Sequence, residues 1–349
     1  MDAQPVQASG RSGRGLILGK FLPPHRGHQY LADFARQYVG EVTVLVCTLP
    51  SDSIPGRLRY EWMKAMLPYD NVKVIHVTDQ VPQEPCEHPE FWPIWRQLIR
   101  KYEPRRIDFV FASEDYGRKL AEILDARYVP VDPLRELNPV SGTMIRDNPM
   151  KHWPMLPSCV RPYFAKRIAI IGPESTGKST LARELAKAFD SVYAWEFARP
   201  WLDPKGGQCD PDDIEHIARG QLATEDAMAL HANRVLICDT NLLLTTIWSE
   251  TLFGSCPEWI VAAARSRRYD AHLLLRPDVP WVDDNQRYFP DHARRKAFFD
   301  VCERRLQAWD INYQIIEGGW NDRLAASREA IARVLQANPR PAATGQQGL

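Results

Sequence analysis

The amino-acid sequence predicts an α/β protein made of two domains, each built on a parallel β-sheet. Its 349 residues fit two domains of ordinary size. Short runs of consecutive apolar residues, typical of strands that are buried on both faces, alternate with helical stripes. This alternation is interrupted once, at 148–165, where four prolines occur without a regular period.

Composition and charge exclude several classes of protein. Hydrophobic residues make up 44% and charged residues 25% of the chain, which argues against disorder and against a fibrous fold. The 44 basic and 44 acidic residues cancel, whereas a protein that coats nucleic acid carries a basic excess, so we expect no nucleic-acid partner. No run of 18 apolar residues and no signal peptide is present, which predicts a cytoplasmic protein without a membrane partner. The seven cysteines form no Cys-x-x-Cys pair, so we expect reduced thiols and no zinc site.

The first domain is expected over 14–150, after a disordered lead-in at 1–13. One helical stripe is carried by Tyr30, Leu31, Phe34, Ala35 and Tyr38, and a second by Leu58, Trp62, Met63 and Met66. The expected strands, which lie between and after these stripes, are 15–19, 42–47, 72–77, 107–112 and 127–131.

A histidine-bearing turn joins the first strand to the first helix. It reads Gly19-Lys20-Phe21-Leu22-Pro23-Pro24-His25-Arg26-Gly27-His28. The two histidines stand at a helix N-terminus, where anions bind, and could donate hydrogen bonds to a phosphate under attack. A metal site is the competing interpretation, but no third ligand is obvious.

A second phosphate site is expected near the end of this domain. Ser141-Gly142-Thr143-Met144-Ile145-Arg146 begins a helix with hydroxyls and exposed N–H groups. Arg146 adds a permanent cation that can contact two oxygens at once.

The second domain is expected over 166–338, between a linker at 151–165 and a flexible tail at 339–349. Its expected strands are 167–172, 192–195, 234–238, 271–275 and 313–316.

A phosphate-binding loop opens this domain. Residues 172–179, Gly-Pro-Glu-Ser-Thr-Gly-Lys-Ser, match G-x-x-x-x-G-K-[ST] and stand between an apolar strand and a helical stripe. In such a loop Lys178 reaches the β- and γ-phosphates of ATP, and the hydroxyl of Ser179 binds Mg²⁺. The residues expected to bind ATP are Gly172, Glu174, Ser175, Thr176, Gly177, Lys178, Ser179 and Thr180.

Three further residues follow strands of the second domain. Asp239 ends an apolar strand, where it could bind Mg²⁺ or merely cap the next helix. Glu196 lies after the second strand and could accept a proton from a substrate hydroxyl. The alternative for Glu196 is a surface ion pair with Arg199.

An arginine-rich segment lies late in the second domain. It could close as a lid and bring an arginine to the transferring phosphoryl group, or it could be a solvated helix face. The candidate lid residues are Arg287, Arg294 and Arg295.

The motifs together resemble a known family. The pattern G-x-F-x-P-x-H-x-G-H, matched at Gly19, Phe21, Pro23, His25, Gly27 and His28, and the Ser141–Arg146 segment are similar to those of the nucleotidyltransferase superfamily. With the P-loop domain that follows, the chain resembles the NadR-type bifunctional enzymes over about 14–336. The resemblance implies a Rossmann-like nucleotidyltransferase domain followed by a P-loop kinase domain. It also implies two activities, ribosylnicotinamide kinase and nicotinamide mononucleotide adenylyltransferase.

The resemblance also implies roles for residues. His25 and His28, with Gly19, Lys20 and Phe21, would bind ATP in the first domain, and Ser141, Thr143 and Arg146 would hold the departing pyrophosphate. Lys178, Glu196 and Asp239 would serve the kinase step. Substrate contacts would come from Glu196, Arg199, Trp281, Asp283 and Asp284. Trp92 and Trp95 could stack on a nicotinamide ring or lie buried under a loop.

The implied ligands are small molecules: ATP, nicotinamide riboside, nicotinamide mononucleotide and NAD, with Mg²⁺ as cofactor. Whether the chain forms a homo-oligomer stays open. Some family members carry an N-terminal helix-turn-helix domain, and the 13 residues before the first strand are too few for one, so we do not expect DNA binding.

Two other functions remain open. A phosphopantetheine adenylyltransferase fused to dephospho-coenzyme A kinase would share both phosphate motifs. A regulator that senses nucleotides without turnover would also keep them. Assays with both acceptors, and detection of pyrophosphate release, separate these alternatives.

Overall fold

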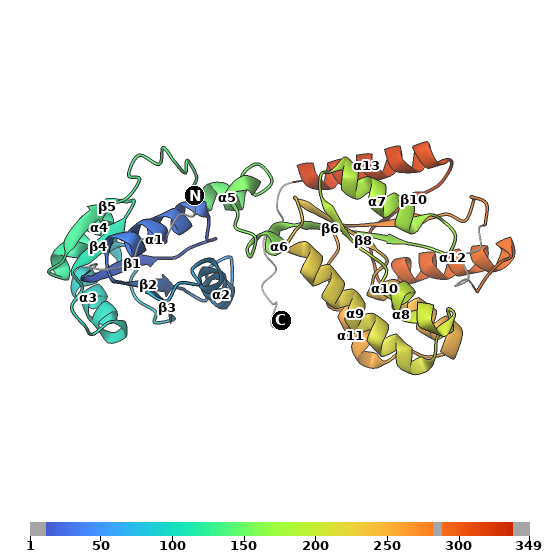
Figure 1. Cartoon of the computed structure of the whole chain (residues 1–349), viewed down its shortest axis with the longest axis horizontal. Helices are drawn as coiled ribbons and strands as arrows, with labels where there is room; N and C mark the ends of the chain where they lie inside the picture. The colour runs from blue at the N-terminus through green and yellow to red at the C-terminus, as the bar shows by residue number, and fades with distance from the viewer. Residues whose placement is uncertain (1–11, 282–287, 338–349) are drawn as a thin grey trace, which may run out of the picture. The chain divides into compact units, whose positions relative to one another are not determined.

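A computed structural model describes residues 12–281 and 288–337. The chain divides into two compact units, one ending at Val160 and the other spanning Arg161–Ala337 (Figure 1). Each unit contains one five-stranded parallel sheet, so the predicted fold class is confirmed. The ten strands of the described chain all lie within two residues of their predicted positions.

The sheet of the first unit has the strand order β3-β2-β1-β4-β5. Its strands are β1 (Arg14–Gly19), β2 (Glu41–Cys47), β3 (Val72–Val77), β4 (Phe109–Ala112) and β5 (Arg127–Pro130). Its α-helices are α1 (Arg26–Tyr38), α2 (Gly56–Met66), α3 (Phe91–Tyr102), α4 (Tyr116–Ile123) and α5 (Gly142–Asp147). The strand order reverses at β1, and ligands of open α/β sheets bind at the carboxyl ends of the strands beside such a reversal.

Both faces of this sheet are buried, because neighbouring residues of a strand point to opposite sides. Ile17 and Val44 pack in one core with residues of α1 and α2, whereas Leu16 and Leu45 pack in a second core with residues of α3 and α4. The continuous apolar runs of β1 and β2 thus supply both cores.

The sheet of the second unit has the strand order β10-β9-β6-β8-β7. Its strands are β6 (Lys166–Ile171), β7 (Val192–Ala194), β8 (Val235–Asp239), β9 (Ala271–Leu275) and β10 (Tyr313–Ile316). Its helices are α6 (Arg161–Phe164), α7 (Lys178–Ala188), α8 (Ala198–Leu202), α9 (Pro211–Ala229), α10 (Leu242–Phe253), α11 (Glu258–Ser266), α12 (His292–Ala308) and α13 (Trp320–Gln336). Residues of α7 and α13 pack on one face of β6, and residues of α10 and α12 pack on the other.

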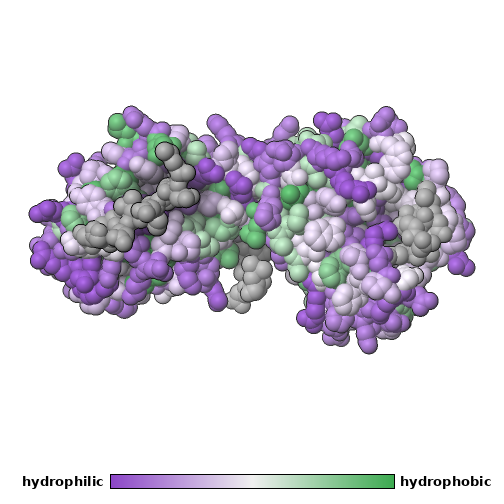
Figure 2. Space-filling model, in the orientation of Figure 1, coloured by the Kyte–Doolittle hydropathy of each residue, from purple (hydrophilic) through white to green (hydrophobic). Residues whose placement is uncertain are grey.

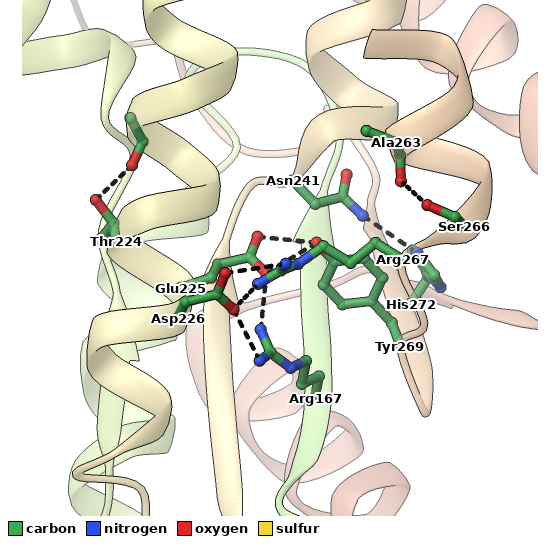
Figure 3. Close-up of polar contacts among 11 residues, drawn as sticks. Arg167, Thr224, Glu225, Asp226, Asn241, Ala263, Ser266, Arg267, Tyr269 and His272 are labelled. Carbon is green, nitrogen blue, oxygen red and sulfur yellow. Dashed lines mark hydrogen bonds and ion pairs between the residues drawn. The ribbon is translucent and has the colours of Figure 1, made fainter. Parts of the chain in front are cut away.

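A buried charge network ties α9 to the start of β6 (Figure 3). The carboxylate of Glu225, which is 0% exposed, accepts hydrogen bonds from Arg267 Nε at 2.9 Å, Arg167 at 3.2 Å and the Tyr269 hydroxyl at 2.8 Å. Both arginines also contact Asp226, so two cations face two anions. A buried carboxylate is tolerated only when it is paired and hydrogen-bonded, as it is here. This network lies where β6 begins, at the edge of the sheet opposite the phosphate-binding loop.

The predicted linker, 151–165, contains packed side chains. Trp153, Leu156 and Val160 are buried, and Cys159 Sγ donates to the Trp62 carbonyl of α2 at 3.7 Å. The predicted tail and residues 1–11 of the lead-in lie outside the described residues.

Hydrophilic side chains cover much of the face drawn in Figure 2, with smaller hydrophobic patches among them. Among the described residues, no helix combines the length and the apolar character that crossing a membrane requires.

Candidate active sites

The histidine-bearing turn of the first unit is held by its own side chains. His25 caps α1, and its Nδ1 accepts the Gly27 N–H at 3.1 Å. Nδ1 of His28 accepts the His25 N–H at 3.3 Å, and the two rings stack with centroids 3.7 Å apart. Because each Nδ1 is an acceptor, the proton of each neutral ring sits on Nε2. Both histidines therefore present an N–H donor.

The environment keeps both rings uncharged. Burial, followed by the positive charge of Arg135, lowers the pKa of His25 to about 4. Burial, His25 and Arg135 together hold the pKa of His28 well below its usual range. At neutral pH the turn therefore offers hydrogen bonds rather than cations to a phosphate.

A fully buried arginine fixes the start of this turn. Arg59 donates to the Lys20 carbonyl at 2.5 Å and to the Ile54 carbonyl at 3.1 Å, and forms an ion pair with Asp52 at 2.5 Å. The next residue of the turn, Phe21, is buried with φ 47° and packs its ring edge-on against His28. The sequence alone did not predict this role of Arg59.

The structure brings the Ser141–Arg146 motif to the histidine-bearing turn. The guanidinium of Arg146 donates to the Leu22 carbonyl and to Thr143 Oγ1, the latter at 3.0 Å. A Cβ on Gly142 would lie 2.3 Å from the Leu22 carbonyl oxygen, so only glycine allows this approach. Ser141 Oγ caps α5 by accepting the Met144 N–H at 3.2 Å. Two motifs more than a hundred residues apart therefore form one site.

Trp92 and Trp95 lie apart from these motifs, on α3. Trp95 is 6% exposed in the core, and its indole N–H donates to the Pro82 carbonyl at 2.9 Å. Trp92 is partly buried against the same core. The burial of Trp95 favours the alternative in which it lies under a loop rather than stacking on a nicotinamide.

The phosphate-binding loop of the second unit is built from unusual backbone conformations. Gly172 and Gly177 have φ of 138° and 83°, and Ser175 has φ 55°. A Cβ on Gly172 would lie 2.7 Å from the Leu275 carbonyl oxygen, so the loop can pass β9 only with glycine there. Lys178 is buried and donates to the Pro173 carbonyl of its own loop at 2.9 Å.

A second fully buried arginine fixes this loop. Arg323 of α13 donates to the carbonyls of Thr176 at 3.2 Å and Gly318 at 2.9 Å, and forms an ion pair with Asp278. The sequence alone did not predict this role of Arg323 either.

Glu174, which the motif predicts to bind ATP, accepts hydrogen bonds from backbone N–H groups of a distant segment. Its carboxylate accepts the backbone N–H groups of Tyr288 at 3.0 Å and Phe289 at 2.5 Å. The Tyr288 hydroxyl in turn donates to the Gly207 carbonyl at 2.7 Å. The Glu174 side chain therefore joins the loop to the chain before α12.

Asp239 and Ser179 meet beside the loop. Asp239 is 1% exposed and hydrogen-bonds Ser179, while its Oδ1 has no hydrogen-bond partner among the described residues. Burial, followed by the negative charge of Glu196, raises the pKa of Asp239 to about 7. A buried carboxylate oxygen without a partner, next to a hydroxyl, is a fitting ligand set for Mg²⁺.

A cavity of about 530 Å³ opens in front of these groups. Its polar lining includes Lys178, Ser179, Thr180, Glu196, Arg199 and Asp239, and its aromatic lining includes Tyr193, Trp195, Trp248 and Tyr288. Glu196 and Arg199 lie 4.0 Å apart and form an ion pair, yet both remain at the cavity wall. The volume fits a small acceptor molecule.

The predicted lid and the predicted substrate contacts before it are only partly described. The lid residue Arg287 and the substrate contacts Asp283 and Asp284 lie outside the described residues. Arg295 is 4% exposed and donates to the Val279 carbonyl at 3.5 Å, which does not fit an arginine that closes from solvent. Arg294 is exposed and pairs with Asp291 at 3.3 Å. Trp281 has a buried indole nitrogen without a partner in the described chain.

Comparisons with known proteins agree with this division. A cytidylyltransferase-like family model matches residues 16–148, and an AAA domain model matches 167–323. The trifunctional NAD biosynthesis/regulator protein NadR of Escherichia coli is 30% identical over 325 residues, which cover 87% of this chain and 78% of that protein. The chain belongs to the NadR family.

A second NadR sequence and two solved NadR structures are also similar to this chain. NadR of Salmonella typhimurium is 28% identical over 344 residues, with 92% of this chain and 83% of that protein covered. A solved structure of NadR protein in complex with NR has a TM-score of 0.76 at 20% identity, covering 94% of this chain and 98% of that one. A second, of NadR protein with NAD and AMP-PNP, has a TM-score of 0.75, covering 95% and 98%. These two structures share the NadR fold with this chain.

Proposed function

We propose that this protein makes NAD in two steps, phosphorylating nicotinamide riboside with ATP and then adenylylating the product. The observation that carries the proposal is that one NadR family chain contains both an assembled P-loop site and an assembled histidine site. The solved structures of NadR proteins with NR, and with NAD and AMP-PNP, support the same choice of substrates. The coenzyme A alternative and the non-catalytic regulator are not favoured.

In the kinase step, the 5′-hydroxyl of the riboside attacks the γ-phosphorus of ATP. An oxygen–phosphorus bond forms, the bond to the β-phosphate oxygen breaks, and its electron pair leaves on ADP. Glu196 takes the hydroxyl proton, and Lys178 leaves the Pro173 carbonyl for the phosphates. The aromatic wall of the cavity receives the nicotinamide ring. Ser179 and Asp239 would hold Mg²⁺, which neutralises phosphate charge when bound.

In the adenylyl step, a 5′-phosphate oxygen of the mononucleotide attacks the α-phosphorus of a second ATP. The bond from the α-phosphorus to the departing oxygen breaks, and pyrophosphate carries the electron pair away. The neutral Nε2–H groups of His25 and His28 donate to the α-phosphate as its charge shifts. Ser141, Thr143 and Arg146 hold the pyrophosphate. The attacking phosphate is already an anion, so no general base is required.

Product analysis tests this proposal. After incubation with nicotinamide riboside, ATP and Mg²⁺, we expect nicotinamide mononucleotide first and NAD second, with release of pyrophosphate. Absence of both products would reject it, and preferential turnover of phosphopantetheine would favour the coenzyme A alternative.

Two substitutions separate the steps. Lys178→Ala should abolish riboside phosphorylation and leave adenylylation of supplied mononucleotide intact, and His28→Ala should do the reverse. Lys187→Ala, on the exposed face of α7, is the matched control and should leave both rates unchanged. Loss of both activities in a folded single variant would contradict two independent sites.

A further inference from the structure

The loop between β5 and α5 lies beside the histidine-bearing turn. The Asp132 carboxylate accepts the N–H groups of Leu137 at 3.4 Å and Asn138 at 3.3 Å, and the Asp132 carbonyl accepts the Arg135 N–H at 2.9 Å. A Cβ on Gly27 would lie 3.5 Å from the Asn138 Cβ, so the end of this loop touches the turn. The loop is thus closed on itself and anchored next to His25.

Arg135 carries the positive charge of this loop. Its guanidinium pairs with Glu114, which follows β4, at 2.5 Å, and the two side chains are 38% and 58% exposed. Strands β1, β4 and β5 are parallel neighbours, so the residues that follow them share one edge of the sheet. The positive charge of Arg135 lowers the pKa of both His25 and His28, as expected for a cation at that edge.

The groups of the histidine site described so far carry too little positive charge to balance a triphosphate. Both histidines are uncharged, and Arg146 already donates to the Leu22 carbonyl and to Thr143. A triphosphate brings several negative charges into this space. Arg135 belongs to the loop that touches the histidine-bearing turn. Because its exposed ion pair with Glu114 contributes little stability, exchanging Glu114 for a phosphate costs little free energy.

We propose that Arg135 is a further triphosphate-binding residue of the adenylyltransferase site, held ready by Glu114 until ATP replaces that carboxylate. This inference rests on the proposed adenylyl transfer. As the α-phosphorus gains a bond to the mononucleotide and loses its bond to pyrophosphate, negative charge grows on the departing group. A guanidinium donates two parallel hydrogen bonds to such oxygens.

Variants of the two partners distinguish this role from a structural ion pair. In the full-length protein with nicotinamide mononucleotide and Mg–ATP, Arg135→Ala should lower kcat/KM for ATP about 10- to 100-fold, the range for losing a charge-assisted contact. Arg135→Lys should recover part of it. Glu114→Gln should leave the KM for ATP unchanged or lower it up to about fivefold, because it releases the guanidinium. Arg106→Ala removes an exposed arginine paired with Asp108 before β4 and should change nothing.

Opposite effects at the two partners support the inference. Equal losses in Arg135→Ala and Glu114→Gln would overturn it, since a structural pair fails alike from either side. An Arg135→Ala protein with wild-type kinetics would also overturn it. If Arg135→Ala does not fold, Arg135→Lys and Glu114→Gln still decide, by partial retention against equal loss. A wild-type protein that forms no NAD from mononucleotide rejects the proposed function instead.

Discussion

Asp239→Asn should stabilise the second unit while impairing its catalysis. Burial raises the pKa of Asp239 from 3.8 to about 7, so between these pH values the folded protein holds a proton that the unfolded chain has released. Raising the pH through this window therefore favours unfolding. At about 1.4 kcal/mol per pH unit, the burial penalty at pH 8 is about 4 kcal/mol. Asparagine removes this penalty but leaves an amide partly unpaired at a cost of about 1–3 kcal/mol.

We therefore expect Asp239→Asn to raise the free energy of unfolding of the second unit by about 1–3 kcal/mol at pH 8 in metal-free buffer. Near pH 4 and below, the gain should turn into a loss of about 1–3 kcal/mol, because the wild-type carboxyl is then largely protonated in both states and only the cost of the partly unpaired amide remains. Urea unfolding at pH 4 to 8 with a chelator measures this, using the transition whose shift by Mg–ATP is lost in Lys178→Ala, which identifies the second unit. Asp300→Asn, which changes the same group on the surface of α12, is the matched control. A variant less stable than wild type at pH 8 would refute the reasoning.

Three further predictions concern both sites. Glu196→Gln should lower kcat for riboside phosphorylation about 10²–10⁴-fold without losing ATP binding. If added Mg²⁺ restored the kcat of Glu196→Gln, the result would show instead that Glu196 is a metal ligand. Gly142→Ala should abolish NAD formation from supplied mononucleotide and spare the kinase, because its Cβ would clash with the Leu22 carbonyl; normal rates would contradict the close approach. As pH falls from 6.5 to about 4, the low pKa of His25 should cost the first unit roughly 3 kcal/mol of unfolding free energy, because unfolded His25 binds a proton first. The low pKa of His28 adds to this loss, so urea unfolding should show a smaller loss in His25→Gln than in the wild-type protein, and an equal loss would contradict the prediction.

The sequence predicted the strands well, because buried parallel strands are continuous apolar runs whose character depends on few distant residues. It also placed Lys178, Ser179 and Asp239 correctly at one edge, since the ends of parallel strands share that edge. The sequence did not show whether the histidines of the turn are neutral hydrogen-bond donors or cations. Their charge depends on the low pKa of His25, which is caused by burial and by Arg135 of a loop far away in the sequence.

The roles of Arg59, Arg323 and Glu174 could not be predicted from the sequence, for a different reason. The partners of Arg59 and Arg323 are backbone carbonyls, which carry no residue-specific signal. Arg59 did leave one trace, because it lies on the same helical stripe as Trp62 and Met63, where a charged residue is out of place. The Glu174 carboxylate could not be assigned either, since its partners are N–H groups more than a hundred residues away.

Arg59 and Arg323 have a consequence for how ATP binds. Each guanidinium draws carbonyl oxygens of a phosphate-binding turn toward the protein interior, so the conformational freedom of that turn is already lost when the chain folds. An arriving anion then meets dipoles that need not reorient, which favours rapid and tight capture. Each half of the chain has its own buried arginine for this purpose. The affinity of one ATP site can therefore drift under mutation while the other keeps its preorganised form.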